Sequence, residues 1–348
     1  MLDSFKVKKA GIELGLDLVG ITGVERFDRF KKIADEEILA GKVPSDMRRA
    51  EPTLNDTSIS CDPRSIMPKA RSIIALGLRY HHEGTEMTKE PWDPRGKVAR
   101  HHWDDTYADL EYKRDKMIEM IRSEGHDAFW DPRVPVKPAV CRSGVGVFGK
   151  NTLIQNEDLG SWVIYSVVLT DAELEPDEEI GPRCGSCQRC IRLCPTKAIP
   201  EPFVLDPSKC LSYVLSSERP IPIELREAVE DRIDGCDVCQ EVCPRNEGLV
   251  KMKVEGPQRS HPWGMAPKLL ELLKMDEREY LRRCSSLRWH GPSLRTLKRN
   301  AIIALGNTGD CSTIAALEPF VLGVDEDLAE HARWAMDAIR KRESDRTR

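Results

Sequence analysis

Eight cysteines between residues 184 and 243 carry the clearest chemical signal in this sequence of 348 residues. The first four have the spacing C-x2-C-x2-C-x3-C and are followed by proline; a lone cysteine and a C-x2-C-x3-C-P run come later. The first spacing is typical of iron–sulfur proteins, because two residues between thiolates let one tight loop bind three corners of a cubane. The sequence therefore predicts two [4Fe–4S] clusters.

The fourth cysteine of such a run binds the other cluster in ferredoxins that hold two clusters. We therefore expect the ligands to be exchanged between the two runs, which uses all eight thiols. The first ligand set is then Cys184, Cys187, Cys190 and Cys243, and the second ligand set is Cys194, Cys210, Cys236 and Cys239. Structural zinc sites or disulfides are the alternative. They do not account for the third and fourth cysteines of the first run with the proline that follows.

Composition predicts a soluble globular protein, with 40% hydrophobic and 32% charged residues. The first nine residues lack the apolar stretch of a secretory signal, and no apolar run is long enough to span a bilayer. We therefore expect a cytoplasmic protein with no membrane partner, in a compartment where cysteines bind metals rather than form disulfides. The net charge of −5 gives no general attraction to nucleic acid, so an RNA partner needs a local basic patch.

Strand and helix patterns alternate over residues 1–175, which predicts an α/β or α+β domain. Strand-like apolar runs lie at 18–22, 70–78 and 162–171, and residues 107–123 have helical spacing. A ferredoxin-like domain over 176–255 and a helical domain over 256–348 follow. Small residues repeat at an offset of 31 between residues 299–305 and 330–336, which is typical of a HEAT-like helical hairpin.

Two further segments are candidates for binding. Residues 142–152 are rich in glycine but are not a P-loop, because Asn151 separates Lys150 from Thr152. They suit either a phosphate or a large planar cofactor, with contacts from Arg142, Gly144, Gly146, Gly149 and Lys150. The second segment is basic and suits either an RNA backbone or a solvated helix face. Its members are Arg282, Arg283, Arg288, Arg295, Lys298 and Arg299.

Several stretches resemble the epoxyqueuosine reductase family, which comprises cobalamin-dependent iron–sulfur enzymes. They cover most of residues 60–250. Besides the cysteine runs, they include the segments at 62–78, 96–100, 144–152, 160–162, 169–177 and 210–213. The resemblance implies a nitroreductase-like cobalamin domain at 1–175, electron delivery through the ferredoxin-like domain, and a HEAT-like C-terminal domain.

The resemblance also implies an activity. The family reduces the epoxide of epoxyqueuosine, at the wobble position of a tRNA anticodon, to the alkene of queuosine. Two electrons are needed together with a proton at the oxygen, so we expect tRNA, cobalamin and a carrier such as ferredoxin or flavodoxin as partners of a monomer. The family's proton donor corresponds to Asp131, whose alternative role is that of a turn residue before Pro132. Phe129 and Trp130 are expected to bury its carboxyl and keep it protonated.

The segment after Asp131 and the Arg100-His101-His102-Trp103 stretch depart from the family pattern. Both departures fall on the substrate side, where His101, His102 and Trp103 are candidate pocket residues. Two other interpretations therefore stay open at this point. One is a corrinoid enzyme that acts on another small molecule, as reductive dehalogenases do. The other is an electron-transfer or corrinoid-activating protein with no substrate chemistry of its own.

Overall fold

An antiparallel sheet of strand order β1-β2-β7-β4 forms the centre of the N-terminal part of the chain. The computed structural model describes residues 2–80, 93–249, 265–284 and 291–346. The strands are β1 (Leu18–Thr22), β2 (Ser72–Arg79), β7 (Val163–Thr170) and β4 (Ala128–Phe129). β2 and β7 pair along their whole length, from Ser72 opposite Thr170 to Arg79 opposite Val163. The strands predicted at 18–22, 70–78 and 162–171 are confirmed.

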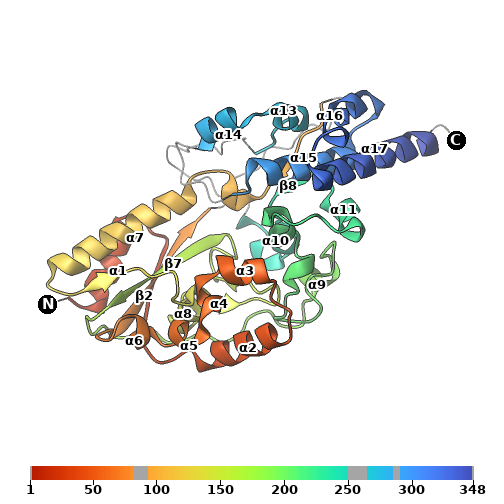
Figure 1. The fold of residues 1–348 in the computed structure, drawn as a ribbon. Helices are drawn as coiled ribbons and strands as arrows, with labels where there is room; N and C mark the ends of the chain where they lie inside the picture. The colour runs from red at the N-terminus through yellow and green to blue at the C-terminus, as the bar shows by residue number, and fades with distance from the viewer. Residues whose placement is uncertain (1, 81–92, 250–264, 285–290, 347–348) are drawn as a thin grey trace.

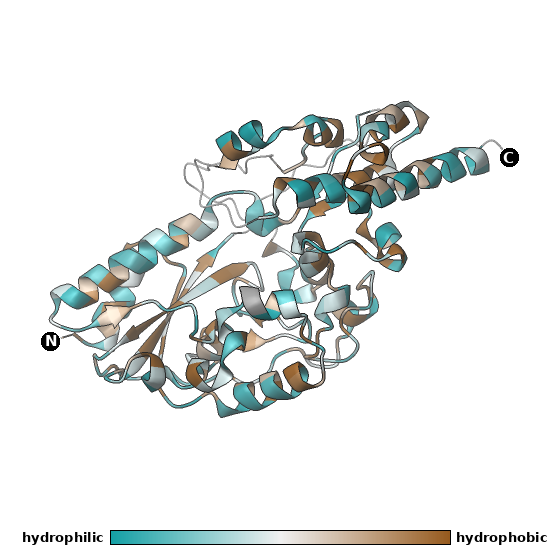
Figure 2. Ribbon diagram, in the orientation of Figure 1, coloured by the Kyte–Doolittle hydropathy of each residue, from teal (hydrophilic) through white to brown (hydrophobic). Residues whose placement is uncertain are grey.

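Both faces of this sheet are covered by helices, so its side chains alternate between two cores (Figures 1 and 2). In β2, Ile74 and Leu76 pack in one core, and Ile73 and Ala75 pack in the other. The first core is closed by α1 (Ser4–Glu13) and α7 (Thr106–Ser123). Shorter helices lie on the side of the second core, namely α2 (Asp28–Leu39), α3 (Ser45–Ala50), α4 (Pro52–Asn55), α5 (Thr57–Ser60), α6 (Pro63–Ile66) and α8 (Val136–Arg142). The arrangement is α+β, one of the two predicted classes.

The cysteine-rich part consists of short elements joined by loops. They are the hairpin β5 (Val147–Phe148) and β6 (Ile154–Gln155), α9 (Arg189–Arg192), η2 (Pro207–Lys209), α10 (Leu211–Ser216), α11 (Ile223–Val229), β8 (Arg232–Asp234), α12 (Val238–Glu241) and η3 (Pro244–Asn246). β8 pairs in parallel with β3 (Lys97–Val98), which leads into η1 (Arg100–His102). This pairing ties the N-terminal part to the cysteine-rich part.

The C-terminal part is helical, as predicted. It contains α13 (Leu269–Lys274), α14 (Glu277–Cys284), α15 (Leu294–Thr308), η5 (Cys311–Ala316), α16 (Glu318–Val321) and α17 (Glu326–Arg346). The repeated small residues let α15 and α17 approach closely, since a Cβ on Gly306 would lie 2.8 Å from the Cα of Ala335. None of the helices in the described part of the chain combines the length and apolar composition needed to cross a membrane.

Arg299 of α15 fixes the C-terminal helices to the cysteine-rich part. Its side chain is fully buried. The guanidinium donates to the carbonyl oxygens of Ser217 at 2.6 Å and Val214 at 3.0 Å, and also to those of Leu215 and Arg219. These carbonyls belong to the last turn of α10 and the residues after it, where a helix leaves acceptors unpaired. Burial lowers the pKa of Arg299 to about 10, so it stays charged at neutral pH.

We expect Arg299→Met to lower the free energy of unfolding by about 3 kcal/mol, because several buried carbonyls lose their donor. Chemical denaturation of the purified protein measures this change. Arg295→Met is the matched control, since Arg295 makes partly exposed ion pairs with Asp325 and Asp327 and its loss should cost less than about 1 kcal/mol. Equal costs for the two variants would contradict this role of Arg299.

Candidate functional site

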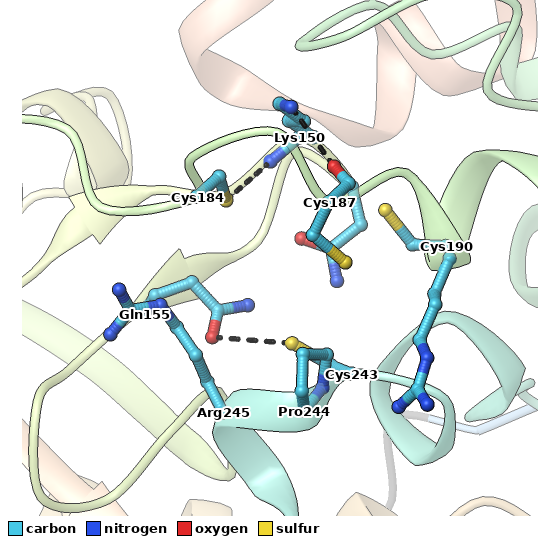
Figure 3. Close-up of a pocket in the computed structure, with 10 residues that line it drawn as sticks. Lys150, Gln155, Cys184, Cys187, Cys190, Cys243, Pro244 and Arg245 are labelled. Carbon is cyan, nitrogen blue, oxygen red and sulfur yellow. Dashed lines mark hydrogen bonds between the residues drawn. The ribbon is translucent and has the colours of Figure 1, made fainter.

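The first ligand set lines one pocket. Figure 3 shows the sulfur atoms of Cys184, Cys187, Cys190 and Cys243 directed toward a common space. Cys184 and Cys187 come from the loop before α9, Cys190 lies in α9, and Cys243 follows α12 from the other cysteine run. The remaining lining residues are Lys150, Asn151, Gln155, Arg189, Pro244 and Arg245. The structure thus brings together the four thiols that the exchanged pattern predicts.

Lys150 fastens the loop that carries the first three thiols. Its ammonium donates to the carbonyl oxygens of Gly185 at 2.7 Å and Cys187 at 2.9 Å, and its backbone N–H donates to the Cys184 sulfur at 3.4 Å. A backbone donor to a sulfur stabilises the negative charge of a ligating thiolate. In this structure the hydrogen bonds of Lys150 therefore hold the loop that carries Cys184 and Cys187.

Thiols of the second ligand set lie within electrostatic reach of one another. Burial raises the pKa of Cys239 well above its ordinary value, and the charges of Cys236 and Cys210 add to the shift. Cys210 in turn lies within electrostatic reach of Cys194, whose sulfur accepts from the backbone N–H of Ala198 at 3.3 Å. In the described ranges no group of three or more His, Cys, Asp or Glu side chains has the spacing that holds a single metal ion.

The glycine-rich segment packs mostly against protein. Arg142 donates to the Thr22 hydroxyl and to the carbonyls of Gly23 and Glu25. A Cβ on Gly144, which has a φ of 71°, would collide with the carbonyl oxygen of Glu178. Gly146 is similarly close to Ile154, and Gly149 to Asn151 and Gln155. Arg142, Gly144, Gly146, Gly149 and Lys150 therefore all have contacts within the protein, and Lys150 also lines the pocket of the first ligand set. Their assignment to a cofactor stays a prediction.

Asp131 lies just beyond β4 and is ion-paired. Arg133 donates to both of its carboxylate oxygens, at 2.9 and 2.7 Å, and the backbone N–H of Arg133 donates to one of them at 2.9 Å. The Arg133 side chain thereby holds the pKa of the Asp131 carboxyl below its ordinary value. Trp130 is 40% exposed and stacks on the guanidinium of Arg114. The expectation that Phe129 and Trp130 keep this carboxyl protonated is therefore wrong for this conformation.

Lys137 and Tyr107 are exposed to solvent although protein surrounds them on several sides. The Lys137 side chain is exposed, yet burial lowers the pKa of its ammonium, which lies near Glu51 and the Cys210 and Cys239 thiols. Tyr107 is 38% exposed, yet burial raises its pKa to about 12. Sequence reasoning assigned no role to Lys137, although it follows Asp131 closely.

A histidine pair lies on the segment that departs from the family pattern. His102 Nδ1 is 2.7 Å from a carboxylate oxygen of Asp234, which is almost completely buried, and the rings of His101 and His102 are 4.0 Å apart. Arg100 packs between the rings of Trp103 and Trp162. These contacts place the segment against β8 and the end of the central sheet, with Tyr107 beside both histidines.

The predicted basic patch is largely neutralised. Arg299 is buried, so its assignment as a phosphate contact is wrong. Arg282 and Arg283 both pair with Glu279, and Arg295 pairs with Asp325 and Asp327. Lys298 lies over the ring of Phe320, and burial lowers its pKa. Arg288 lies outside the described residues. These contacts favour the solvated-face alternative for this helical surface.

Paired substitutions test the exchange of ligands between the two runs. Cys184→Ser with Cys243→Ser removes thiols from one ligand set only, so we expect about four of about eight irons to remain. Cys184→Ser with Cys194→Ser should remove both clusters, although these two cysteines belong to the same run. Iron and sulfide analysis of anaerobically purified protein measures the outcome.

The control for these pairs is Cys311→Ser, because Cys311 is exposed and lies outside both sets. Retention of one cluster in the variant that lacks Cys184 and Cys194 would contradict the exchange. Zinc in the wild-type protein, without sulfide, would contradict iron–sulfur ligation altogether.

Comparisons with known proteins agree with this geometry. A family model, the 4Fe–4S double cluster binding domain, matches residues 183–246. The epoxyqueuosine reductase of Lactococcus garvieae is 28% identical over 99% of this chain and 98% of its own length. That of Escherichia coli is 30% identical over 95% of this chain and 88% of its own length.

Solved structures extend the likeness to the whole fold. Epoxyqueuosine reductase from Bacillus subtilis, with its catalytic aspartate loop swung out of the active site, has a TM-score of 0.88 and 27% identity over 96% of this chain and 90% of that one. An epoxyqueuosine reductase with an epoxyqueuosine-modified tRNA-Tyr stem loop has a TM-score of 0.87 and 27% identity, over 96% of this chain and 89% of that one. Sequence and fold thus agree over nearly the full length, and the chain belongs to the epoxyqueuosine reductase family.

Proposed function

We propose that this chain reduces epoxyqueuosine in tRNA to queuosine, with two [4Fe–4S] clusters and a corrinoid as cofactors. The observation that carries the proposal is the convergence of the first ligand set on one pocket, within a fold that matches epoxyqueuosine reductases over nearly its whole length. The first and second ligand sets would hold the clusters. The likeness covers the N-terminal part as well as the cysteine-rich part, which favours an enzyme over a pure electron carrier.

We propose one role for each of the three domains inferred from the sequence. Residues 1–175 would form a nitroreductase-like domain for corrinoid and substrate, residues 176–255 the ferredoxin-like domain, and residues 256–348 the HEAT-like domain. The position of Lys137 supports a corrinoid site between the first two. It belongs to α8, on a covered face of the central sheet, and its ammonium lies near Cys210 and Cys239 of the second ligand set.

The side chains around α8 suit a large cofactor rich in amides. The Tyr165 hydroxyl is buried and has no hydrogen-bond partner in the described part of the chain, and both Tyr165 and Lys137 lie within electrostatic reach of Cys141. A buried hydroxyl without a partner calls for one that the polypeptide does not supply. Lys137 and Tyr165 would bind the corrinoid's amide groups. A bound corrinoid supplies low-valent cobalt, which delivers electrons to carbon in a way that side chains cannot.

The reaction needs a proton source at the epoxide oxygen. Two electrons and two protons convert the epoxide to the alkene and water, and breaking the C–O bond without a proton would leave an unstabilised alkoxide. Asp131 is the proposed donor. In the present conformation Arg133 keeps its carboxyl ionised. Donation therefore requires Asp131 to leave Arg133, after which burial against the substrate would raise its pKa.

An anaerobic assay on tRNA that carries epoxyqueuosine tests the function. We expect the wild-type protein, reconstituted with iron, sulfide and cobalamin, to form queuosine when dithionite supplies the electrons. Asp131→Asn should lower kcat by about a hundredfold or more, since proton donation contributes a factor of that order. Mass spectrometry of the digested tRNA measures the product.

The matched control is Asp28→Asn, because Asp28 also pairs with an arginine two residues away, Arg26, but lies on the exposed surface. No turnover by the wild-type protein would reject the function. Equal turnover by wild type and Asp131→Asn would reject Asp131 as the donor while leaving the function in place.

The pH dependence tests the pairing of Asp131 with Arg133. A proton donor works only while protonated, so kcat falls as the pH rises through its pKa. Arg133 lowers that pKa, and Arg133→Met should therefore raise it and move the alkaline limb of the kcat profile to higher pH. Turnover measured from pH 5 to 9 checks the shift, with Arg26→Met as the control. An unmoved limb would show that the Arg133 pair does not govern the step.

A further inference from the structure

We propose that a surface beside the cysteine sets, which borders the first-set pocket at Arg189, is the docking site for a small acidic protein that carries single electrons. We call it the entry surface, and it comprises Arg189, Arg192, Leu193, Lys197 and Phe203. The inference rests on the proposed function in one respect, which is that the cysteine sets hold redox clusters. It goes further by assigning the surface through which electrons reach the chain and the charge of the partner.

Charge is the first observation. Residues 182–200 contain four basic residues and no acidic residue, in a chain whose net charge is −5. Two of the four pair with surface glutamates, Arg183 with Glu157 and Arg189 with Glu247. Arg192 and Lys197 are exposed, and neither has an acidic partner in the described ranges. The overall charge repels an acidic protein, so these cations select where one can approach.

Apolar exposure is the second observation. Leu193 is 53% exposed and Phe203 is 50% exposed. Phe203 has a φ of 69°, which a bulky residue adopts only when its surroundings impose it. The Phe203 backbone N–H donates to the carbonyl oxygen of Lys150, a residue of the pocket lining, at 3.1 Å. The protein thus uses a strained backbone to hold an aromatic ring at the surface beside the first ligand set, and exposed rings of this kind serve as contact points for partners.

Closeness to the cysteines is the third observation. Arg189 lines the pocket of the first ligand set. Leu193 directly precedes Cys194 of the second set, and the Lys197 backbone N–H donates to the Cys194 carbonyl oxygen at 3.2 Å. A carrier docked at the entry surface therefore lies beside cysteines of both sets.

The electron balance is compatible with a carrier of this kind. Each docking oxidises the carrier by one electron, which the chain accepts at one of the two ligand sets. Two successive dockings supply the two electrons that, with two protons, turn one epoxide into one alkene and one water. Repeated docking demands a contact that forms quickly and releases quickly, and a few exposed cations around a small apolar centre provide one.

Charge reversal at two positions of the entry surface tests the inference. The variant is Arg192→Glu with Lys197→Glu, and the probe is a purified flavodoxin of strongly negative charge. We expect its affinity for the holoenzyme, measured by calorimetry at low salt, to fall roughly tenfold, because two attractive charges become repulsive. The affinity of the wild-type protein should weaken as salt is added, and that of the variant should depend less on salt.

The matched control is Arg340→Glu with Lys341→Glu, which reverses two charges on the exposed side of α17, far along the chain from the cysteines. Iron and sulfide content is checked in each protein; if the double variant loses its clusters, Leu193→Asn replaces it. Equal binding of flavodoxin by variant, control and wild type would overturn the proposal.

Two outcomes separate this proposal from its alternatives. If the entry surface instead binds RNA, charge reversal will weaken tRNA binding and leave flavodoxin binding intact, which also overturns it. Turnover with flavodoxin should fall while turnover with dithionite is retained, since dithionite needs no protein docking. Absence of turnover with dithionite in the wild-type protein would reject the proposed function alone, because flavodoxin binding is measured separately.

Discussion

The structure depends on a small set of polar contacts that join the central sheet to the cysteine-rich part. The side-chain amide of Asn246 is buried and fully used. Its oxygen accepts from the Ser161 N–H at 2.9 Å, and its nitrogen donates to the Ser161 hydroxyl at 2.9 Å and the Gln240 carbonyl at 2.8 Å. A buried amide with all partners in place fixes one geometry, because leaving any of them unpaired is costly. Through it the residues just before β7 hold the turn that presents Cys243.

Gly160 and Tyr80 complete this junction. Gly160 has a φ of 59°, and a Cβ there would collide with the Asn246 side-chain oxygen, so only glycine lets the two segments meet. The Tyr80 hydroxyl, at the end of β2, bonds to the Gln240 amide at 2.8 Å. Two strands of the sheet are thus tied to α12. The sheet, rather than the short loops that carry them, therefore fixes the positions of the cysteines on either side of α12.

Much of this arrangement is predictable from sequence where the signal is local. Cysteine spacing predicted the four thiols that line one pocket in the structure, because the positions of three of them are set within seven residues. The strands around Ile74 and Val167 follow from apolar runs. What sequence reasoning missed depends on partners far along the chain. The contacts of Lys150 are an example, because nothing near it in the sequence shows that its ammonium reaches Gly185 and Cys187.

Two expectations were wrong because they depend on side-chain contacts: that Arg299 contacts phosphate, and that the Asp131 carboxyl is neutral. A basic helix suggests a solvated face, and only the fold shows that Arg299 caps α10, some eighty residues earlier in the sequence. The Asp131 carboxyl was expected to be neutral beside two aromatic rings. It instead forms an ion pair with Arg133, only two residues away. The sequence contained both residues, but the choice between aromatic burial and an ion pair depends on side-chain directions that a pattern does not specify.

The buried Arg299 also bears on the order in which the protein matures. α10 begins directly after Cys210, a member of the second ligand set. The carbonyls of its last turn accept from the guanidinium of Arg299, which is synthesised much later than α10. While the nascent chain lacks α15, the end of α10 has unpaired carbonyls and the frame around Cys210 is unfinished. The frame around Cys210 is therefore complete only after α15 has been synthesised, whereas Lys150 precedes Cys184, Cys187 and Cys190 in the chain and is present as soon as their segment emerges.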